Sequence, residues 1–455
     1  MVHYKSLKLT FENFHNIIQN IVTLESNPVV AVAVSGGADS ICLTSLLKNY
    51  IDTIGGKLVA VTVNHNLRED SLKEAEDVNN FLSDVGIEHH ILNYNGPKPK
   101  SNIMEEAREL RYNLLYKFCK ENDIINLAIA HHFDDQIENF LIRLDRGSGT
   151  EGLSAMPTLI FNDGIRLIRP LLYFKKNEIY TYLNNKDINW IEDPTNINRK
   201  FKRNNIRVLI DNINPLDDIN VDRLFKTSNH LLRSNFTINN LVSDFFSNHV
   251  VLSKVGVVRF NLTDFIVIDN ELSLRVLSQI LQTISSSTKP PRFEKLNNLH
   301  TALKSVDIDF KKSNLLGCTI SRKDDIISVY RDHGLIENDR FHFDINNYFS
   351  IRWDNRFNIN IGKLCDSNNK YFVTKLTEEI RLELKGLKAN INGYPIDLLY
   401  TLPVIKAAVT NSNVETLEKI IAVPHINYYT NDILMNNISV EFLPSKPLTK
   451  VVRDI

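Results

Sequence analysis

Short apolar runs alternate with longer amphipathic segments over the first two hundred residues. The apolar runs predict strands at 29–34, 58–63, 87–94 and 125–130. Helical periodicity between them predicts helices at 40–50, 71–85, 102–122 and 134–146. Strands that alternate with helices form parallel sheets whose two faces are both covered. The pattern therefore predicts a doubly wound α/β domain over residues 1–211.

A different pattern begins near residue 212, where helical segments rich in Leu, Phe and Asn replace the alternation. We expect a hairpin at 250–260 and a break at Pro290-Pro291 within a mainly helical domain over 212–333. From residue 334 onward the apolar runs again resemble strands, which indicates a small α+β domain over 334–455. In this last domain we expect strands at 341–351, 357–361, 419–423 and 438–443, and helices at 376–388 and 397–410.

Composition narrows the class of protein. A chain of 455 residues with 43% hydrophobic and 24% charged residues is typical of a soluble protein with several globular domains. No apolar run approaches the roughly 20 residues that a membrane span needs, and the N-terminus lacks the apolar core of a secretory signal. The four cysteines lack the paired spacing of a zinc site. We expect a cytoplasmic protein with reduced thiols and no membrane partner.

The charge distribution favours local contacts with nucleic acid over general ones. A formal net charge of −1 argues against a protein that coats RNA through its overall field. The segment 199–207 nevertheless carries five basic residues, no acidic residue and the aromatic Phe201. By itself this segment is equally typical of a solvated loop and of a surface that contacts RNA phosphates.

The most informative motif is the hexapeptide SGGADS at 35–40, which follows the first strand directly and precedes an apolar helix. Adjacent glycines let the backbone turn sharply with its N–H groups facing inward, and the helix N-terminus adds its positive dipole end. Such a loop binds phosphate or pyrophosphate, and Ser35 and Ser40 would add hydroxyl donors. The alternative is an ordinary tight turn in which Asp39 and Ser40 are favoured only by the helix dipole.

Asp39 is the unusual member of this loop. A carboxylate among phosphate-binding amides repels the ligand unless a divalent cation lies between them. The loop therefore predicts Mg²⁺ together with a phosphate ligand. It is not a Walker A loop, because the GxxxxGK pattern is absent.

Two more motifs follow predicted strands. VNHNLR at 63–68 places His65 and Arg68 at a strand end, where open α/β sheets bind ligands, although an ordinary polar loop is the alternative. AHHFDDQIE at 130–138 follows the fourth strand. Asp135 and Glu138 lie three residues apart on one helical face, so both carboxylates are able to reach one cation, either Mg²⁺ or an ammonium group. The paired histidines before them are explained equally well as core residues.

These motifs resemble those of known enzymes. SGGADS resembles the SGGxDS loop of the PP-loop ATP pyrophosphatases, which cleave ATP between the α and β phosphates. The other two motifs resemble segments of the tRNA(Ile)-lysidine synthetase family, except that Asn66 replaces a frequent glycine and Asn139 a frequent threonine. Four later stretches match that family in the same order, at 146–156, 169–172, 190–196 and 201–207. The resemblance covers residues 28–208 and weakens beyond them.

The resemblance implies a reaction. ATP would adenylate the C2 carbonyl oxygen of the wobble cytidine in tRNA(Ile) with a CAU anticodon. The ε-amine of L-lysine would then displace AMP and leave lysidine in the tRNA. A homodimer is one of the arrangements that the resemblance leaves open.

The resemblance also implies roles for individual residues. Asp39 and Asp135 would bind Mg²⁺, Asp135 or Glu138 would orient lysine, and Arg207 would neutralise the α-phosphate. It favours contact of Arg203 and Arg207 with RNA or with the reacting phosphate. The expected nucleotide-binding residues are Ser35, Gly36, Gly37, Ala38, Asp39, Ser40, His65 and Arg68.

Three other classes of protein are rivals. A tRNA thiolase shares the loop but uses paired cysteines or an iron–sulfur cluster, for which the four cysteines are not placed. A synthetase coupled to a glutaminase needs a catalytic cysteine motif, which the sequence lacks. The third rival is a non-catalytic tRNA-binding protein that keeps ATP as a structural ligand. The intact Asp39 and the intact HHFDDQ segment argue against it.

Overall fold

The computed structural model divides into two compact units, Met1–Thr237 and Ile238–Lys450, and the boundary between them along the chain falls within helix α9 (Val221–His249). None of the helices in the described part of the chain is long and apolar enough to span a membrane. The structure describes residues 7–64, 71–94, 96, 103–162, 164–191, 206, 220–305, 310–337, 339–344, 347–363, 370–391, 394–410 and 416–449.

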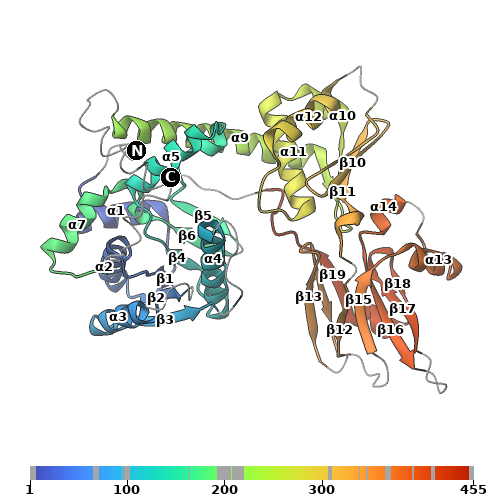
Figure 1. Cartoon of the computed structure of the whole chain (residues 1–455), viewed down its shortest axis with the longest axis horizontal. Helices are drawn as coiled ribbons and strands as arrows, with labels where there is room; N and C mark the ends of the chain where they lie inside the picture. The colour runs from blue at the N-terminus through green and yellow to red at the C-terminus, as the bar shows by residue number, and fades with distance from the viewer. Residues whose placement is uncertain are drawn as a thin grey trace. The chain divides into compact units, whose positions relative to one another are not determined.

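A six-stranded sheet forms the centre of the first unit (Figure 1). Its order is β3-β2-β1-β4-β6-β5, and its neighbours pair in parallel except for the edge strand β5, which is antiparallel to β6. The chain winds outward from β1 to β3 and then crosses back to β4, as in doubly wound folds. The strands are β1 Val29–Ala33, β2 Lys57–Asn64, β3 Glu88–Asn93, β4 Asn126–Ala128, β5 Leu159–Asn162 and β6 Ile165–Ile168.

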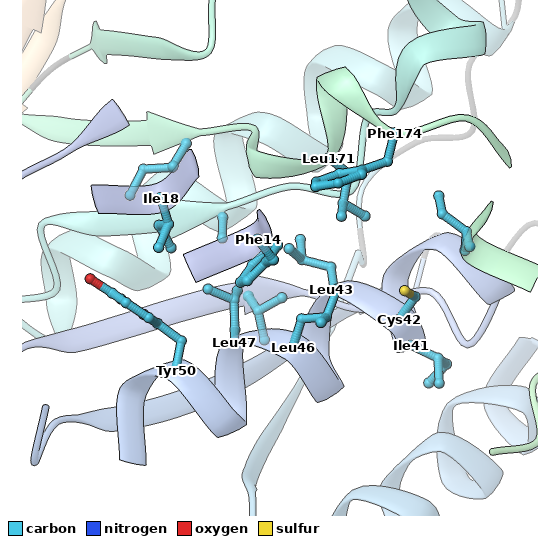
Figure 2. Close-up of a cluster of buried hydrophobic side chains, with 14 of the residues drawn as sticks. Phe14, Ile18, Ile41, Cys42, Leu43, Leu46, Leu47, Tyr50, Leu171 and Phe174 are labelled. Carbon is cyan, nitrogen blue, oxygen red and sulfur yellow. The ribbon is translucent and has the colours of Figure 1, made fainter. Parts of the chain in front are cut away.

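Helices cover both faces of this sheet. Alternation along β1 places Val30 and Val32 in a core shared with α1, α2, α3, α5 and α7, and Ala31 in a second core shared with α4. Figure 2 shows the first core, in which Phe14 of α1 lies beside Leu43 and Leu47 of α2. The helices are α1 Phe11–Ile21, α2 Ala38–Thr53, α3 Ser71–Asp84, α4 Ile103–Glu121, α5 Phe133–Asp145, α6 Thr150–Leu153, the 3-10 helix η1 Pro170–Tyr173, and α7 Lys176–Asn185.

The prediction of a doubly wound α/β domain is confirmed, and its four expected strands and four expected helices are present. The sequence pattern does not reveal α1, nor the β5–β6 hairpin that extends the sheet. Helix α1 has 11 residues and precedes the first predicted strand, whereas β5 and β6 have four residues each, too few to establish a period.

The second unit begins with a five-stranded antiparallel sheet of order β7-β8-β11-β10-β9, packed against helices. The expected helices of 212–333 are present, but of this sheet the sequence predicts only the β7–β8 hairpin. The elements are β7 Val250–Leu252, β8 Val257–Asn261, α10 Leu262–Val267, α11 Asn270–Ser285, α12 Phe293–Lys304, β9 Lys312–Leu315, β10 Cys318–Lys323 and β11 Ile326–Arg331.

Two further sheets complete this unit, with orders β12-β15-β16-β17-β18 and β13-β14-β19. Their core joins that of the preceding sheet, because Val257 and Tyr330 pack with Leu398 and Leu402. Because residues on both sides of position 334 share this core, the core does not mark a boundary there, and the domain boundary near residue 334 stays a prediction. The elements are η4 His333–Leu335, β12 Phe341–Phe343, β13 Phe349–Trp353, β14 Phe357–Ile361, β15 Lys370–Lys375, α13 Glu378–Gly386, α14 Ile396–Leu399, β16 Pro403–Thr410, β17 Thr416–Val423, η5 Pro424–Ile426, β18 Tyr428–Tyr429, α15 Asp432–Asn437 and β19 Ile438–Phe442.

The prediction of a helix at 397–410 is wrong. Only α14 is helical, and the rest forms β16, which pairs with β15 on one side and β17 on the other. Leu398, Leu402 and Ile405 are spaced as on a helical face, but all three are buried. A strand buried on both faces gives a continuous apolar run, which periodicity does not distinguish from a buried helix.

Candidate active site

The loop between β1 and α2 has a conformation that requires glycine at position 36. Gly36 has a φ of +83°, in the left-handed region that other residues rarely adopt. A Cβ atom there would lie 2.8 Å from Val78 Cγ2 and 3.1 Å from Ile191 Cδ1. The Gly36 carbonyl also accepts the backbone N–H of Ile191 at 2.9 Å. The turn is therefore fixed by neighbours on two sides.

Two serine hydroxyls support this turn from within. Ser40 Oγ accepts the backbone N–H of Ser35 at 3.1 Å and donates to the Gly37 carbonyl at 2.9 Å. The Oγ atoms of Ser35 and Ser40 are 3.3 Å apart. Ser40 is buried whereas Ser35 is exposed, so Ser40 holds the shape of the loop and Ser35 is accessible to a ligand.

Helix α2 begins at this turn without a side-chain cap. Gly37 is its N-cap residue, and Ala38, Asp39 and Ser40 form its first turn. The first N–H groups of a helix have no carbonyl partner within it, and the helix dipole makes this end positive. A Cβ atom at Gly37 would meet only Ser35 Oγ, at 3.7 Å, so the space beside the turn is open. The start of α2 is thus suited to a phosphate group.

His132 connects the loop with helix α5. Its Nδ1 accepts the backbone N–H of Asp134 at 3.2 Å, and the Asp135 carboxylate accepts the backbone N–H of His132 at 3.1 Å, so the pair caps α5. On the other side of the ring, Nε2 lies 3.5 Å from Asp39 Oδ2 and 3.6 Å from Asp135 Oδ2. The loop carboxylate of Asp39 and the α5 carboxylate of Asp135 therefore both lie beside one nitrogen of this imidazole.

The carboxylates around His132 control its charge. Burial by itself lowers the pKa of His132, but Asp135, Asp134 and Asp39 outweigh burial and raise this pKa well above its usual value. For Asp134 burial has the opposite effect and raises the pKa of the carboxyl group. The contact with His132 and the backbone N–H of Lys176, 2.8 Å away, outweigh burial, so the pKa of Asp134 is lowered overall. In the neutral ring, Nδ1 accepts the Asp134 N–H and the proton lies on Nε2, which faces Asp39 and Asp135. The protonated ring carries a proton on both nitrogens, and its Nδ1 then faces the Asp134 carboxylate, 3.4 Å away.

Helix α5 also holds the segment that follows it. Gln136 donates to the Met156 carbonyl at 3.0 Å and accepts the Met156 backbone N–H at 2.6 Å. Arg143 donates to the Gly152 carbonyl at 2.7 Å. Glu138, one turn after Asp135, is only 2% exposed. The glycine-containing segment is therefore attached to the helix that presents Asp135 and Glu138.

Basic side chains gather beside these carboxylates, at the end of β4. Arg108 Nη2 lies 3.1 Å from His131 Nε2 and 3.3 Å from the Tyr112 hydroxyl, and the guanidinium lies 5.3 Å from the centre of the Tyr112 ring. Burial lowers the pKa of His131 well below its usual value, and nearby arginines, Arg111 among them, oppose the effect of Asp135. His131 is therefore neutral.

Arg169 reaches this group from the end of β6, the strand next to β4. It is 6% exposed, and its Nη1 donates to the Pro157 carbonyl at 2.8 Å. It also bonds to the Tyr112 hydroxyl. Parallel strands place their carboxyl ends at one edge of a sheet, so Arg169 and His131 share that edge with the loop between β1 and α2.

The donor set at His132 fits Mg²⁺ only in combination with a phosphate ligand. Among the residues with described positions, no group of three or more His, Cys, Asp and Glu side chains is arranged to hold a metal ion. Mg²⁺ usually takes one or two carboxylates and completes its shell with water and substrate phosphates. The carboxylates of Asp39 and Asp135 are partly exposed, and both lie within 3.6 Å of Nε2 of His132. They also lie beside the start of α2, which is suited to a phosphate group.

The structure brings together the expected loop residues and Asp135, with Glu138 one turn further along α5. The expected His65, Arg68, Arg203 and Arg207 lie outside the described residues. Sequence reasoning does not assign a role to His132, Arg108 or Arg169. For His132 a signal exists, since it directly precedes an acidic first helical turn, where a side chain that accepts a hydrogen bond serves as a cap.

Comparison with known proteins places this site in a family. The model of the PP-loop domain matches residues 9–213. A tRNA(Ile)-lysidine synthase of Orientia tsutsugamushi is 31% identical over 449 residues, which cover 95% of this chain and 97% of that protein. One from Wolbachia pipientis is 33% identical over 91% of this chain and 94% of its own.

The chain belongs to the tRNA(Ile)-lysidine synthase family. The similarity to these synthases extends through the second unit as well as the PP-loop domain. Among solved structures, a U34-tRNA thiolase from Methanococcus maripaludis matches 49% of this chain and 78% of its own, with 20% identity and a TM-score of 0.42.

Three of the four cysteines of this synthase family member lie in the described part of the chain, each in a different hydrophobic core. Cys42 lies in the core on one face of the large sheet, and Cys119 in the core on the other face. Cys318 lies in the second unit. All three are free and buried, and burial raises the pKa of Cys119 and of Cys318 to about 12.

Proposed function

We propose that this protein joins L-lysine to C2 of the wobble cytidine in tRNA(Ile) with a CAU anticodon, and that it consumes ATP and releases AMP and pyrophosphate. The convergence of Asp39 and Asp135 on His132 carries the proposal, because it unites a phosphate-binding helix end with the carboxylates of α5. ATP use accords with the PP-loop domain, and the names of the relatives supply the tRNA and the product. The protein acts in the cytoplasm, and the modified tRNA reads AUA and is charged with isoleucine.

Activation of the base is the first step. The exposed hydroxyl of Ser35 and the first N–H groups of α2 hold the phosphates of ATP. Asp39 and Asp135 would hold Mg²⁺, which would neutralise phosphate charge when bound. The C2 carbonyl oxygen of cytidine attacks the α-phosphate, the bond between the α and β phosphates breaks, and pyrophosphate leaves. Arg207 is assigned to the α-phosphate from the family motif alone.

Attack by lysine is the second step. An ammonium group is not a nucleophile, so the ε-amine must lose a proton before it attacks C2. Asp135 and Glu138 lie one turn apart on α5, and Glu138 is almost wholly buried, which suits a carboxylate that orients the ammonium and accepts its proton. The C–N bond forms at C2, and AMP leaves with the former carbonyl oxygen.

A tRNA thiolase is the second candidate, and the positions of the thiols argue against it. Sulfur transfer of that kind needs cysteines that meet each other or bind a cluster. Cys42 and Cys119 are separated by the sheet, and their burial raises the pKa of each thiol, which keeps the thiols protonated and weakly nucleophilic.

An incorporation assay tests the proposal. The purified protein is incubated with ATP, Mg²⁺, radiolabelled lysine and unmodified tRNA(Ile) bearing CAU, with elongator tRNA(Met) as the control RNA. We expect label in the isoleucine tRNA alone, at the wobble cytidine, and none with Asp39→Asn. Cys119→Ala is the matched control and should retain activity, because its side chain lies in the opposite core. Pyrophosphate release without bound lysine would refute the choice of nucleophile.

A further inference from the structure

Two buried donor atoms beside the α5 carboxylates lack hydrogen-bond acceptors. Nδ1 of His131 and Nε of Arg169 are both inaccessible to solvent, and neither has a partner among the residues that the structure describes. Native proteins pair nearly all such groups, so an unpaired buried donor calls for an explanation. These two stand at the carboxyl ends of the neighbouring strands β4 and β6.

The proton on His131 is located by the contact with Arg108. A guanidinium is only a donor, so Nε2 of His131, 3.1 Å from Arg108 Nη2, must accept and cannot carry a proton. A neutral imidazole has one N–H, which is therefore on Nδ1. The atom without an acceptor is thus a donor, as is Nε of Arg169.

The charges around these donors favour an anion. The imidazole of His131 interacts electrostatically with three guanidinium groups, those of Arg108, Arg111 and Arg169, and with the carboxylate of Asp135. Arg169 is more than nine-tenths buried, and its guanidinium donates to the Pro157 carbonyl and bonds to the Tyr112 hydroxyl. The region is rich in donors and positive charge, and it adjoins the carboxylates of α5.

We infer that His131 Nδ1 and Arg169 Nε form a subsite for a carboxylate group. On the proposed function, to which this inference is tied, that group is the α-carboxylate of lysine. A carboxylate offers two acceptor oxygens and one negative charge, which match two N–H donors in a positive surrounding. Lysine also carries an ammonium group at its other end, and Asp135 and Glu138 stand on the adjoining helix to receive it. Specificity for an amino acid over a simple amine would arise here.

Kinetics with two amines test the subsite. Incorporation into tRNA(Ile) is measured with lysine and with 1,5-diaminopentane, which keeps the amine but lacks the carboxylate. Loss of a hydrogen bond to a charged group corresponds to a loss of about 10- to 100-fold. His131→Leu should therefore lower kcat/KM for lysine about 10- to 100-fold. Its kcat/KM for 1,5-diaminopentane should stay within about threefold of that of the unaltered protein. His131→Asn, whose amide N–H lies near the position of Nδ1, should restore most of the preference for lysine.

Arg169→Lys supplies a second variant, because it keeps the charge but removes the Nε–H donor. This variant should also lower the ratio of kcat/KM for lysine to kcat/KM for 1,5-diaminopentane. Arg166→Lys, near the start of strand β6, is the matched control and should leave this ratio unchanged. Thermal melting verifies that each variant folds. His131→Leu keeps the inference testable if Arg169→Lys does not fold.

Three results decide the matter. An unchanged preference for lysine over the diamine in His131→Leu overturns the inference. A rise in KM for ATP or tRNA with the lysine preference retained also overturns it, because the subsite then holds a phosphate. Failure of the unaltered protein to incorporate lysine refutes the proposed function itself, and with it the assignment of lysine to this subsite.

Discussion

Alanine at Gly36 and at Gly37 should have opposite consequences, although the two residues are adjacent. At Gly36 an alanine must adopt a φ of +83°, at a cost of about 1–2 kcal/mol. Its Cβ would also lie 2.8 Å from Val78 Cγ2, and overpacking of this kind costs about 1–3 kcal/mol. The sum, roughly 2–5 kcal/mol, corresponds to a fall in Tm of roughly 5–15 °C for a unit of this size.

At Gly37 an alanine meets no such barrier. The backbone has φ −72° and ψ 160°, which any residue adopts, and the added Cβ would meet only Ser35 Oγ at 3.7 Å. Stability should change by no more than about 0.5 kcal/mol. The methyl group would, however, occupy the open space where a phosphate approaches the start of α2. We expect KM for ATP to rise at least about tenfold, equivalent to about 1.4 kcal/mol.

Differential scanning calorimetry and steady-state kinetics separate the two effects. Gly149→Ala is the control, since its Cβ meets nothing within 4 Å and its φ is −71°. The reasoning is refuted if Gly36→Ala melts with the unaltered protein, or if Gly37→Ala binds ATP normally. A loss of stability in Gly37→Ala equal to that in Gly36→Ala would also contradict it.

Three further perturbations follow from the described contacts. Gln136→Leu leaves both Met156 backbone groups unpaired and should destabilise the first unit by about 1–3 kcal/mol in urea unfolding; an unchanged midpoint would show that these bonds contribute nothing. Burial lowers the pKa of His425 to about 4, so the unfolded chain takes up a proton near pH 6.5 that the folded unit does not. The free energy of unfolding therefore falls as the pH drops from 6.5 toward 4. His425→Phe should reduce the fall in Tm between pH 7.5 and 5, and an unaltered slope of Tm against pH would contradict this reasoning. Cys119 and Cys318 should resist iodoacetamide at pH 8 until urea unfolds the chain, whereas rapid labelling of the folded protein would contradict their burial.

The sequence predicts the α/β unit well because its local signals and its tertiary structure agree. The run at 29–34 is strand-like by composition, and the SGGADS loop after it dictates both the turn and the start of α2. The region 397–410 is the opposite case. Its apolar spacing suits a helix, and only the pairing of β16 with β15 and β17, which is not encoded locally, makes it a strand.

The candidate site is predictable to the extent that its residues lie in one motif. Asp39, Asp135 and Glu138 are identified by their loop and by helical spacing. The role of His132 depends on its distance from Asp39, which lies on another helix, and the role of Arg169 depends on the adjacency of β6 and β4. Contacts between segments so far apart in the sequence follow from the order of strands in the sheet, which periodicity does not supply.

Adenylation of the base is tested most directly with an isotope. A tRNA(Ile) carrying ¹⁸O at C2 of the wobble cytidine is incubated with ATP, Mg²⁺ and lysine, and the products are analysed by mass spectrometry. We predict that ¹⁸O leaves in AMP, with one lysine incorporated for each labelled AMP. Lysine-bearing tRNA that retains ¹⁸O, or AMP that lacks it, would contradict activation of the carbonyl at this site.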